Sequence, residues 1–284
     1  NISIEEKWSF QGENESINLF KSKIKEHSAK SKDKDILSII FWPEVFLPGL
    51  SSKYTKVIDE LEIYISESNF ASIFGILSKS NNEEGVNNSL MSLGKLSGKF
   101  DKQKLVPFGE YVPFTIFDSF FSFFNFNRPN VVSSDNNILI NSKDLNISSA
   151  ICYEIAYQDI FLKHGKQSNL LFNASNDNWF GDTIGPYQHL QIARYRAAEN
   201  RKPLIRSTST GVSALINKFG SIVKSIDIDN LEQKVSNSQQ IESIIFTRSG
   251  HTPFITFGKW PSIFFILILI FGSFFNKMLR NEKN

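Results

Sequence analysis

The chain has 284 residues, 41% of them hydrophobic, and 31 basic and 29 acidic side chains leave a net charge of +2. This length can bury a sizeable core in one large domain or two small ones, and the near balance of charge excludes a basic footprint for nucleic acid. A single cysteine excludes an internal disulfide or a multi-cysteine metal site, and the four histidines lack metal-ligand spacing. We therefore expect no metal ion, no cofactor and no nucleic-acid partner.

The hydrophobic pattern predicts helices and strands that alternate along the chain. After a loop with Trp8, apolar residues at helical spacing predict helices at 16–27, with Ser16 as a possible cap, and at 54–67, 156–164 and 186–200. Short apolar runs predict strands at 35–42, 70–77, 89–96, 145–152, 169–174, 203–207 and 212–217. Residues 81–88 read as a polar turn and 217–220 as a hairpin turn. The alternation favours an α/β fold.

Two apolar segments are unusual. Residues 114–126 are rich in Phe, which suits either a core helix or an arm that dips into lipid, and we favour the arm. Residues 260–275 carry no charge, and together with 254–258 they are just long enough to cross a bilayer. Lys277, Arg280 and Lys283 follow on what would be the cytoplasmic side. We expect a catalytic domain over 1–253, and one transmembrane helix with a short basic tail over 254–284.

Three reactive side chains follow strands or lie on shaped loops. Cys152 comes where an apolar run ends, and it is either a small buried hydrophobe or a nucleophile. Glu44 follows the strand predicted at 35–42, at an edge where α/β folds bind ligands. Lys102 begins the stretch 102–113, whose two prolines and glycine preclude a regular helix or a central strand.

Glu, Lys and Cys in this chain order resemble the triad of the nitrilase superfamily of carbon–nitrogen hydrolases. Within it, the stretches 105–113 (LVPFGEYVP), 151–154 (ICYE) and 175–182 (SNDNWFGD) look like the apolipoprotein N-acyltransferase family, and the likeness extends over nearly the whole chain. The resemblance implies a four-layer α-β-β-α sandwich followed by the transmembrane helix. The family carries a bundle of transmembrane helices before its catalytic domain, so we expect this chain to be the C-terminal portion of a longer protein.

The resemblance also implies roles for particular residues. Glu44 would be the general base, Cys152 the nucleophile, and Lys102 the cation that stabilises the thiolate and the oxyanion. Supporting roles would fall to Glu110 and Glu154 as further acids and to Tyr153, whose backbone N–H would be a second oxyanion donor. The residues expected to bind substrate at the pocket rim are Trp8, Asn176, Asn178 and Trp179.

The implied reaction is ping-pong transfer of a fatty acyl chain through a Cys152 thioester. The donor would be a phospholipid, phosphatidylethanolamine by resemblance, and the acceptor the α-amino group of the N-terminal diacylglyceryl-cysteine of an apolipoprotein. The implied location is the bacterial inner membrane, with a monomeric enzyme whose catalytic domain faces the periplasm. The alternative is a nitrilase-type amidase that hydrolyses a small amide, because the same triad serves both reactions.

Overall fold

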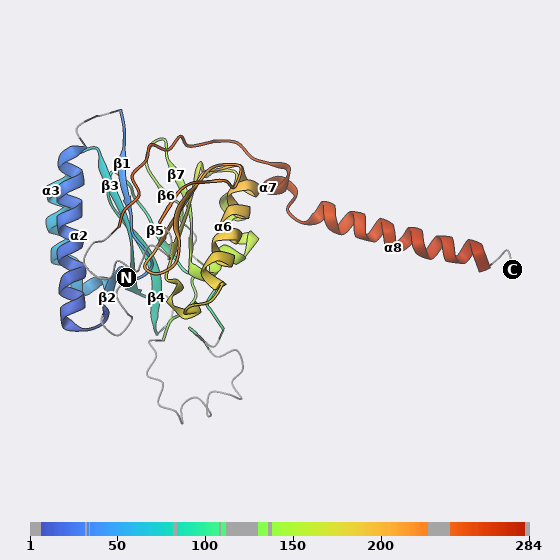
Figure 1. Ribbon diagram of the computed structural model, residues 1–284, viewed down its shortest axis with the longest axis horizontal. Coiled ribbons are helices and arrows are strands. Elements are labelled where there is room, and N and C mark those ends of the chain that lie inside the picture. The colour runs from blue at the N-terminus through green and yellow to red at the C-terminus, as the bar shows by residue number, and fades with distance from the viewer. Residues whose placement is uncertain are drawn as a thin grey trace, which may run out of the picture.

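The computed structural model describes residues 7–31, 33, 35–81, 84–107, 109–111, 130–135, 138–226 and 239–281, with side chains of the last segment described to residue 273. The Phe-rich segment at 114–126 therefore lies outside the described residues. Figure 1 shows two sheets packed face to face, with α2 and α3 outside one sheet and α6 outside the other. This is the α-β-β-α order of layers that the resemblance implied.

The first sheet takes strands from the N-terminal half of the chain. In the described residues its order is β1-β3-β4-β5, with β2 paired to β3 off this path. The pairs β1–β3 and β2–β3 are parallel, and β3–β4 and β4–β5 are antiparallel. Its strands are β1 (Ser38–Phe41), β2 (Leu47–Leu50), β3 (Phe70–Lys79), β4 (Val86–Gly94) and β5 (Lys99–Asp101).

The second sheet takes the later strands, in the order β11-β10-β9-β8-β7-β6. The central pairs β7–β8 and β8–β9 are parallel, and the outer pairs are antiparallel. Its strands are β6 (Ile140–Asn141), β7 (Asn146–Ile151), β8 (Leu170–Ser175), β9 (Leu204–Thr208), β10 (Ser213–Ile216) and β11 (Ile222–Ile226).

Helices close both outer faces. The helical elements of the first half are α2 (Phe10–Lys30), η1 (Ser51–Tyr54) and α3 (Thr55–Ile65). Those of the second half are η3 (Cys152–Ala156), α5 (Gln158–His164), η4 (Asp177–Phe180), α6 (Gly185–Asn200), α7 (Pro253–Phe257) and α8 (Trp260–Asn281).

Three apolar clusters hold the four layers together. Phe20 of α2 and Leu61 of α3 pack with Phe74 of β3, which joins the first helical layer to its sheet. Ile73 of β3 belongs to the cluster of Ile151 and Phe172, which fills the space between the sheets. A third cluster packs α5 and α6 on the second sheet through Phe161, Leu190, Ala193 and Leu204. Together these clusters join the two sheets and their helices into one continuous body, which contains the catalytic candidates.

The structure corrects several predicted boundaries. Helix α2 extends beyond the predicted 16–27 at both ends, and its N-cap is Ser9, whose hydroxyl accepts from the Gly12 N–H. The suggestion that Ser16 caps this helix is wrong, because Ser16 is buried inside it and donates to the Gly12 carbonyl at 2.9 Å. Strand β4 begins at Val86, inside the predicted polar turn, because cross-strand pairing with β3 outweighs the low strand propensity of Asn87 and Asn88. The hairpin turn at 217–220 is confirmed.

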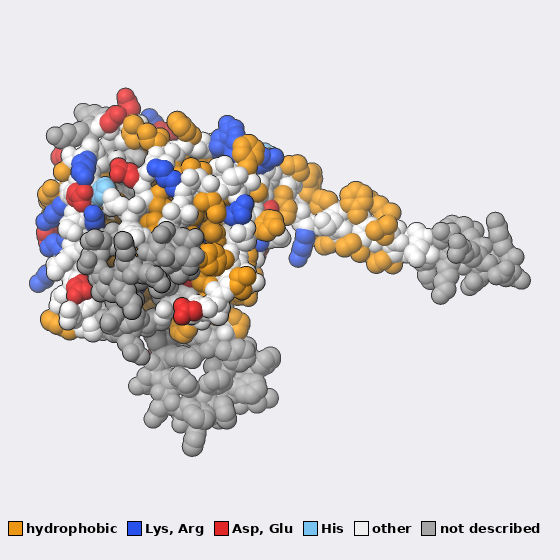
Figure 2. All heavy atoms as spheres, viewed as in Figure 1, with side chains coloured by type: hydrophobic (Ala, Val, Ile, Leu, Met, Phe, Trp, Pro, Cys, Tyr) orange, Lys and Arg blue, Asp and Glu red, His pale blue; other side chains and the backbone are white. Residues whose placement is uncertain are grey.

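The C-terminal segment forms the helix α8, which leaves the body of the molecule (Figure 1). Its side chains from Phe264 to Phe271 are exposed, and they form the apolar surface along this helix in Figure 2. Within the described residues, none of the helices combines the length and hydropathy that crossing a bilayer requires.

Candidate active site

Glu44 sits on a tight turn between β1 and β2. Trp42 anchors the turn, because its backbone N–H donates to the Ile73 carbonyl at 2.8 Å and its indole N–H to the Ser72 hydroxyl at 2.9 Å. The next residue, Val45, has φ 42°, which a β-branched residue rarely adopts. The backbone here crosses so close to Gly75 of β3 that a Cβ there would lie 2.3 Å from the Val45 nitrogen. The fold therefore forces the chain into a strained turn that buries the Glu44 side chain.

Lys102 follows directly after β5 and is 1% exposed. Its Nζ lies 3.5 Å from Glu44 Oε1 and 2.7 Å from Glu110 Oε1. Asn88 of β4 donates its side-chain N–H to the same Glu44 oxygen at 2.8 Å. One buried cation therefore joins two carboxylates that are far apart in the sequence.

Glu110 is positioned by the loop that carries it. Its Oε2 accepts the Val106 N–H at 2.8 Å, and its own N–H donates to the Val106 carbonyl at 2.8 Å. The turn so formed leaves Oε1 free to accept from Lys102. Glu110 therefore pairs with Lys102, and its expected role as a further acid stays a prediction.

Cys152 lies at the end of β7, where the strand gives way to η3. It has φ 52° and is 8% exposed. A left-handed backbone at this position costs energy, of the order of 1–3 kcal/mol for a residue other than glycine, so the surrounding contacts must hold it. The turn brings the thiol close enough to Glu44 and Lys102 for both charges to act on it.

Glu154 supplies one of those contacts. It is fully buried, and its carboxylate accepts the backbone N–H groups of Ile151, Gln103 and Lys104 at 2.6–3.0 Å. Burial raises the pKa of Glu154 to about 7 even though these hydrogen bonds act in the opposite direction. The carboxyl group thus ties the loop after Lys102 to the turn of Cys152.

The electrostatics of the cluster favour a neutral thiol at rest. Burial, and then the negative charge of Glu44, raise the pKa of Cys152 to about 12, although Lys102 acts to lower it. Burial alone would lower the pKa of Lys102, but Glu44 and Glu110 hold it above its ordinary value. Lys102 therefore stays charged, and the thiol needs a base before it can attack.

The predicted rim residues are more exposed. Trp8 is 50% exposed and Trp179 is 74% exposed, while Tyr153, expected as an oxyanion donor through its backbone, has a side chain that is 38% exposed. The Asn176 side chain caps η4 by accepting the Asn178 N–H at 3.3 Å, and it also accepts the Thr210 hydroxyl at 3.0 Å. Asn176 thus shapes this loop, and the Asn178 side chain is exposed.

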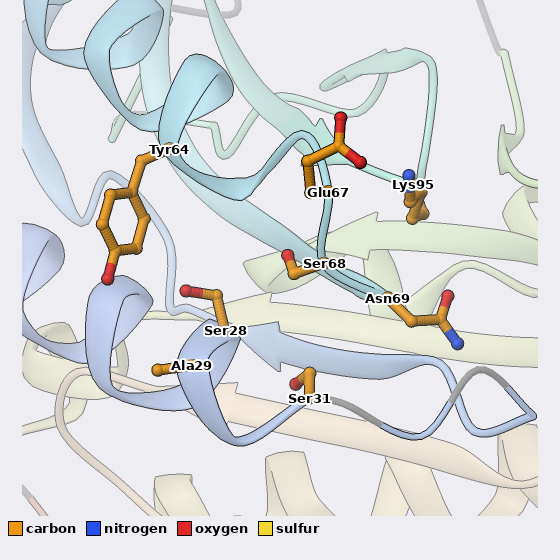
Figure 3. A pocket seen from close by; sticks show the side chains of 8 residues that line it. All are labelled: Ser28, Ala29, Ser31, Tyr64, Glu67, Ser68, Asn69 and Lys95. Atoms are coloured by element: carbon orange, nitrogen blue, oxygen red, sulfur yellow. The ribbon is translucent and has the colours of Figure 1, made fainter.

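A separate depression of about 530 Å³ lies away from these residues, between the end of α2 and the turn from α3 to β3 (Figure 3). Most of the residues that line it have polar side chains, of which those of Tyr64, Glu67 and Lys95 are the larger. It contains no candidate catalytic residue. We therefore assign the chemistry to the buried cluster around Cys152.

Sequence reasoning missed other residues that touch the cluster. Lys7 is buried, its Nζ donates to the Glu44 carbonyl at 3.5 Å, and burial lowers its pKa to about 8. Asn88 fell in a stretch read as a turn, His189 carried no motif, and Ser175 begins the stretch 175–182 but was given no role. The pairing of β4 with β5 places Asn88 beside Lys102, so a correct prediction of β4 would have revealed that contact.

Comparisons with known proteins bear on this arrangement. A family model described as carbon-nitrogen hydrolase matches residues 15–237. An apolipoprotein N-acyltransferase of Photobacterium profundum is 34% identical over 245 residues, which cover 81% of this chain and 45% of that protein. One of Pseudomonas aeruginosa is 30% identical over 288 residues, which cover 100% of this chain and 54% of that protein. The chain thus spans about half the length of these curated relatives.

Solved structures support the fold. A Saccharomyces cerevisiae member of branch 10 of the nitrilase superfamily superposes with a TM-score of 0.57 at 14% identity, over 80% of this chain and 90% of that one. At this identity the likeness concerns the architecture alone.

Proposed function

The chain belongs to the carbon-nitrogen hydrolase family, and from that premise we propose that it is the catalytic portion of an apolipoprotein N-acyltransferase. In this proposal a fatty acyl chain passes from a phospholipid to Cys152, and then to the α-amino group of a diacylglyceryl-cysteine at the N-terminus of an apolipoprotein. The observation that carries the proposal is the buried lysine between two carboxylates beside the thiol. The names of the similar proteins support the choice of acceptor.

Charge conservation explains how a thiol of such high pKa can attack. Moving its proton to Glu44 replaces one buried anion by another, while Lys102 stays between Glu44 and Glu110. The net charge of the buried cluster is unchanged, so the step avoids the large cost of creating a new charge away from water. Glu44 is the general base, and Lys102 stabilises the sulfur as its proton leaves.

In the first half-reaction, the Cys152 sulfur forms a bond to the ester carbonyl carbon of the phospholipid as its proton moves to Glu44. The developing oxyanion is stabilised by Lys102 and by the backbone N–H of Tyr153. Collapse of the tetrahedral intermediate breaks the ester C–O bond, and the lyso-phospholipid oxygen takes the proton from Glu44. A thioester remains on the enzyme, and phosphatidylethanolamine is the donor we propose.

In the second half-reaction, the lipoprotein amine attacks the thioester and gives a proton to Glu44. The C–S bond breaks, an amide forms, and Glu44 returns the proton to the Cys152 sulfur. Water would compete for the thioester, so acyl transfer needs a site that excludes it. We propose that Trp8 and Trp179 contact lipid at the rim, and that Asn176 and Asn178 shape the loop against which the substrate lies.

The exposed apolar side chains of α8 support the proposal of a membrane location. Unbroken exposure of apolar residues from Phe264 to Phe271 is unfavourable in water. We propose that residues 254–284 anchor the chain in the bacterial inner membrane and that residues 1–253 act from its periplasmic side as a monomer. The basic residues Lys277, Arg280 and Lys283 suit the cytoplasmic side.

The acceptor separates this proposal from a small-amide hydrolase. The intact membrane protein is incubated with phosphatidylethanolamine labelled in its sn-1 acyl chain and with a synthetic diacylglyceryl-cysteine peptide, and the peptide is then analysed by mass spectrometry. We expect label on the peptide N-terminus, and none when the amine is acetylated beforehand. Release of free fatty acid alone, or hydrolysis of small amides without labelled peptide, would contradict the proposal.

A further inference from the structure

A second buried polar cluster reaches Cys152 from the other side of its turn. His189 of α6 has its Nε2 3.1 Å from the Cys152 carbonyl oxygen and its Nδ1 2.9 Å from Asp177 Oδ1. Arg206 of β9 donates to Asp177 Oδ2 at 2.6 Å. Because a carbonyl oxygen only accepts hydrogen bonds, Nε2 must carry a proton, and His189 thereby fixes the backbone of Cys152 in its left-handed conformation.

Ser175 joins this cluster to the nucleophile. In the parallel pairing of β7 with β8, Ile151 lies opposite Ala174, so Cys152 and Ser175 follow neighbouring positions at the same end of these strands. The Ser175 side chain is fully buried, acts to lower the pKa of the Cys152 thiol, and donates to Asp177 Oδ1 at 2.8 Å. Ser175 thus lies beside the residue that the proposed reaction uses.

The single proton of Ser175 has two acceptors within reach. While the sulfur is a neutral thiol, the carboxylate of Asp177 is the stronger acceptor and takes it. Burial would raise the pKa of Asp177, but His189 and Arg206 hold it below its usual range, so the carboxylate is ionised. Arg206 continues to satisfy Asp177 when the serine proton points elsewhere. The hydroxyl can therefore turn to a negative sulfur by rotation of its O–H bond alone.

We propose that Ser175 is a further catalytic residue, whose hydroxyl turns from Asp177 to the Cys152 sulfur as the thiolate forms. His189 and Arg206 are positioning residues, since they hold Asp177 and the backbone of Cys152 without touching the sulfur. The inference rests on the nucleophilic role of Cys152 in the proposed function. No bond is broken at Ser175, and the thiol proton still moves to Glu44.

Other charged or titratable groups near the thiol stay the same when Ser175 changes. These groups are Glu44 in the turn after β1, Lys102 and Glu110 after β5, Glu154 in η3, Asp177 in η4 and His189 in α6. A variant that removes only the hydroxyl therefore tests one hydrogen bond.

The test is the rate at which iodoacetamide alkylates Cys152 in the intact protein at pH 8, followed by mass analysis of the peptide that contains it. Only the thiolate reacts, so the rate reports how well the site stabilises it. We expect Ser175→Ala to react about tenfold more slowly, which corresponds to one pH unit in thiolate formation. Removing the hydroxyl opens space, so a slower reaction cannot come from obstruction.

Three further variants provide the controls. Ser175→Thr and Ser175→Val have the same shape and differ in the hydroxyl, so we expect the Thr variant within about threefold of wild type and the Val variant about tenfold below the Thr variant. Ser149→Ala removes a buried hydroxyl of β7 that has no hydrogen-bond partner among the described residues, and it should react like wild type. Equal rates for the folded Thr and Val variants would overturn the inference.

The measurement also separates this inference from the function it rests on. Alkylation needs no acyl donor or acceptor. Dependence of alkylation on the Ser175 hydroxyl, in a protein that never carries an acyl group, would support the role of Ser175 and contradict the acyltransferase.

Discussion

Two buried clusters of opposite character meet at Cys152. In one, the Lys102 ammonium lies 3.5 Å from Glu44 and also pairs with Glu110. The longer distance to Glu44 leaves this carboxylate able to change its protonation state. In the other, Asp177 is held by Arg206 at 2.6 Å and by His189 at 2.9 Å, and both of its oxygens are occupied. In the proposed mechanism, the first sheet thus supplies the groups that exchange protons, and the second supplies those that hold the nucleophile.

The difference shows how one fold can combine reactivity with rigidity. A buried ion pair of good geometry adds little net stability, but breaking it leaves a charge away from water. The Asp177 cluster is therefore suited to fixing a strained backbone. The Glu44 cluster leaves capacity for a proton, which a catalyst needs at the moment of reaction.

Substitutions of Cys152 and in the Glu44 cluster should have the largest effect on turnover. Cys152→Ala, Lys102→Met and Glu44→Gln should each lower the acyl-transfer rate by at least about a thousandfold, because each removes a group that acts in the transition state. The measurement is the initial rate with labelled phospholipid. Lys104→Met is the matched control, since Lys104 pairs with the exposed Asp159 at 3.6 Å and should keep wild-type activity. Losses below about tenfold in the three variants would show that the reactive cluster lies elsewhere.

Substitutions in the Asp177 cluster should mainly lower the free energy of unfolding. Asp177→Asn leaves Arg206 buried without its anion, and we expect it to lower the free energy of unfolding by about 3–5 kcal/mol. Thermal or denaturant unfolding in detergent measures this. Glu60→Gln is the control, because its ion pairs with Lys21 and Lys25 are exposed and should contribute little to stability. A folded Asp177→Asn protein with wild-type stability would contradict the stabilising role given to the Asp177 cluster.

The pH dependence of stability should reveal the buried Glu154 carboxyl. Its pKa is about 7 in the folded state, against an ordinary value of 4.5 that applies to the unfolded chain. Between these pH values the folded protein therefore binds more protons than the unfolded chain does. Stability should therefore fall as pH rises from 4.5 to 7, by about 3 kcal/mol from this group. The difference in unfolding free energy between wild type and Glu154→Gln should change by that amount across this range. A difference independent of pH would mean that Glu154 is ionised throughout.

Two glycines offer the finest test of the comparison, because each lets the backbone approach one cluster. A Cβ at Gly75 would lie 2.5 Å from the Pro43 carbonyl oxygen, beside Glu44, and one at Gly211 would lie 2.4 Å from Asp177 Oδ2. We expect both Ala variants to lose about 1–3 kcal/mol of stability. Gly75→Ala should also displace Glu44 and lower turnover per folded molecule more than Gly211→Ala does. Equal turnover in the two folded variants would contradict the division of roles.

Parts of this arrangement could be predicted from the sequence. Glu44, Lys102 and Cys152 stand in motifs with a distinctive composition, and the alternation of apolar runs indicated an α/β fold. His189 and Arg206 carry no such signal. Ser175 begins the stretch 175–182, but its meeting with them depends on which strands pair. The helix cap at Ser9 was missed because α2 begins with Phe10-Gln11-Gly12, which lacks a helical apolar pattern. The strained turn at Val45 also depends on tertiary contact, through Gly75.

The central claim is that Cys152 carries the acyl chain between donor and acceptor. The direct measurement is the intact mass of the protein after incubation with a phospholipid and without any acceptor. The account predicts an added fatty acyl group that maps to the Cys152 peptide, is removed by hydroxylamine at neutral pH, and is absent from Cys152→Ala. A protein without an acyl adduct under these conditions, or an adduct that persists in Cys152→Ala, would contradict it.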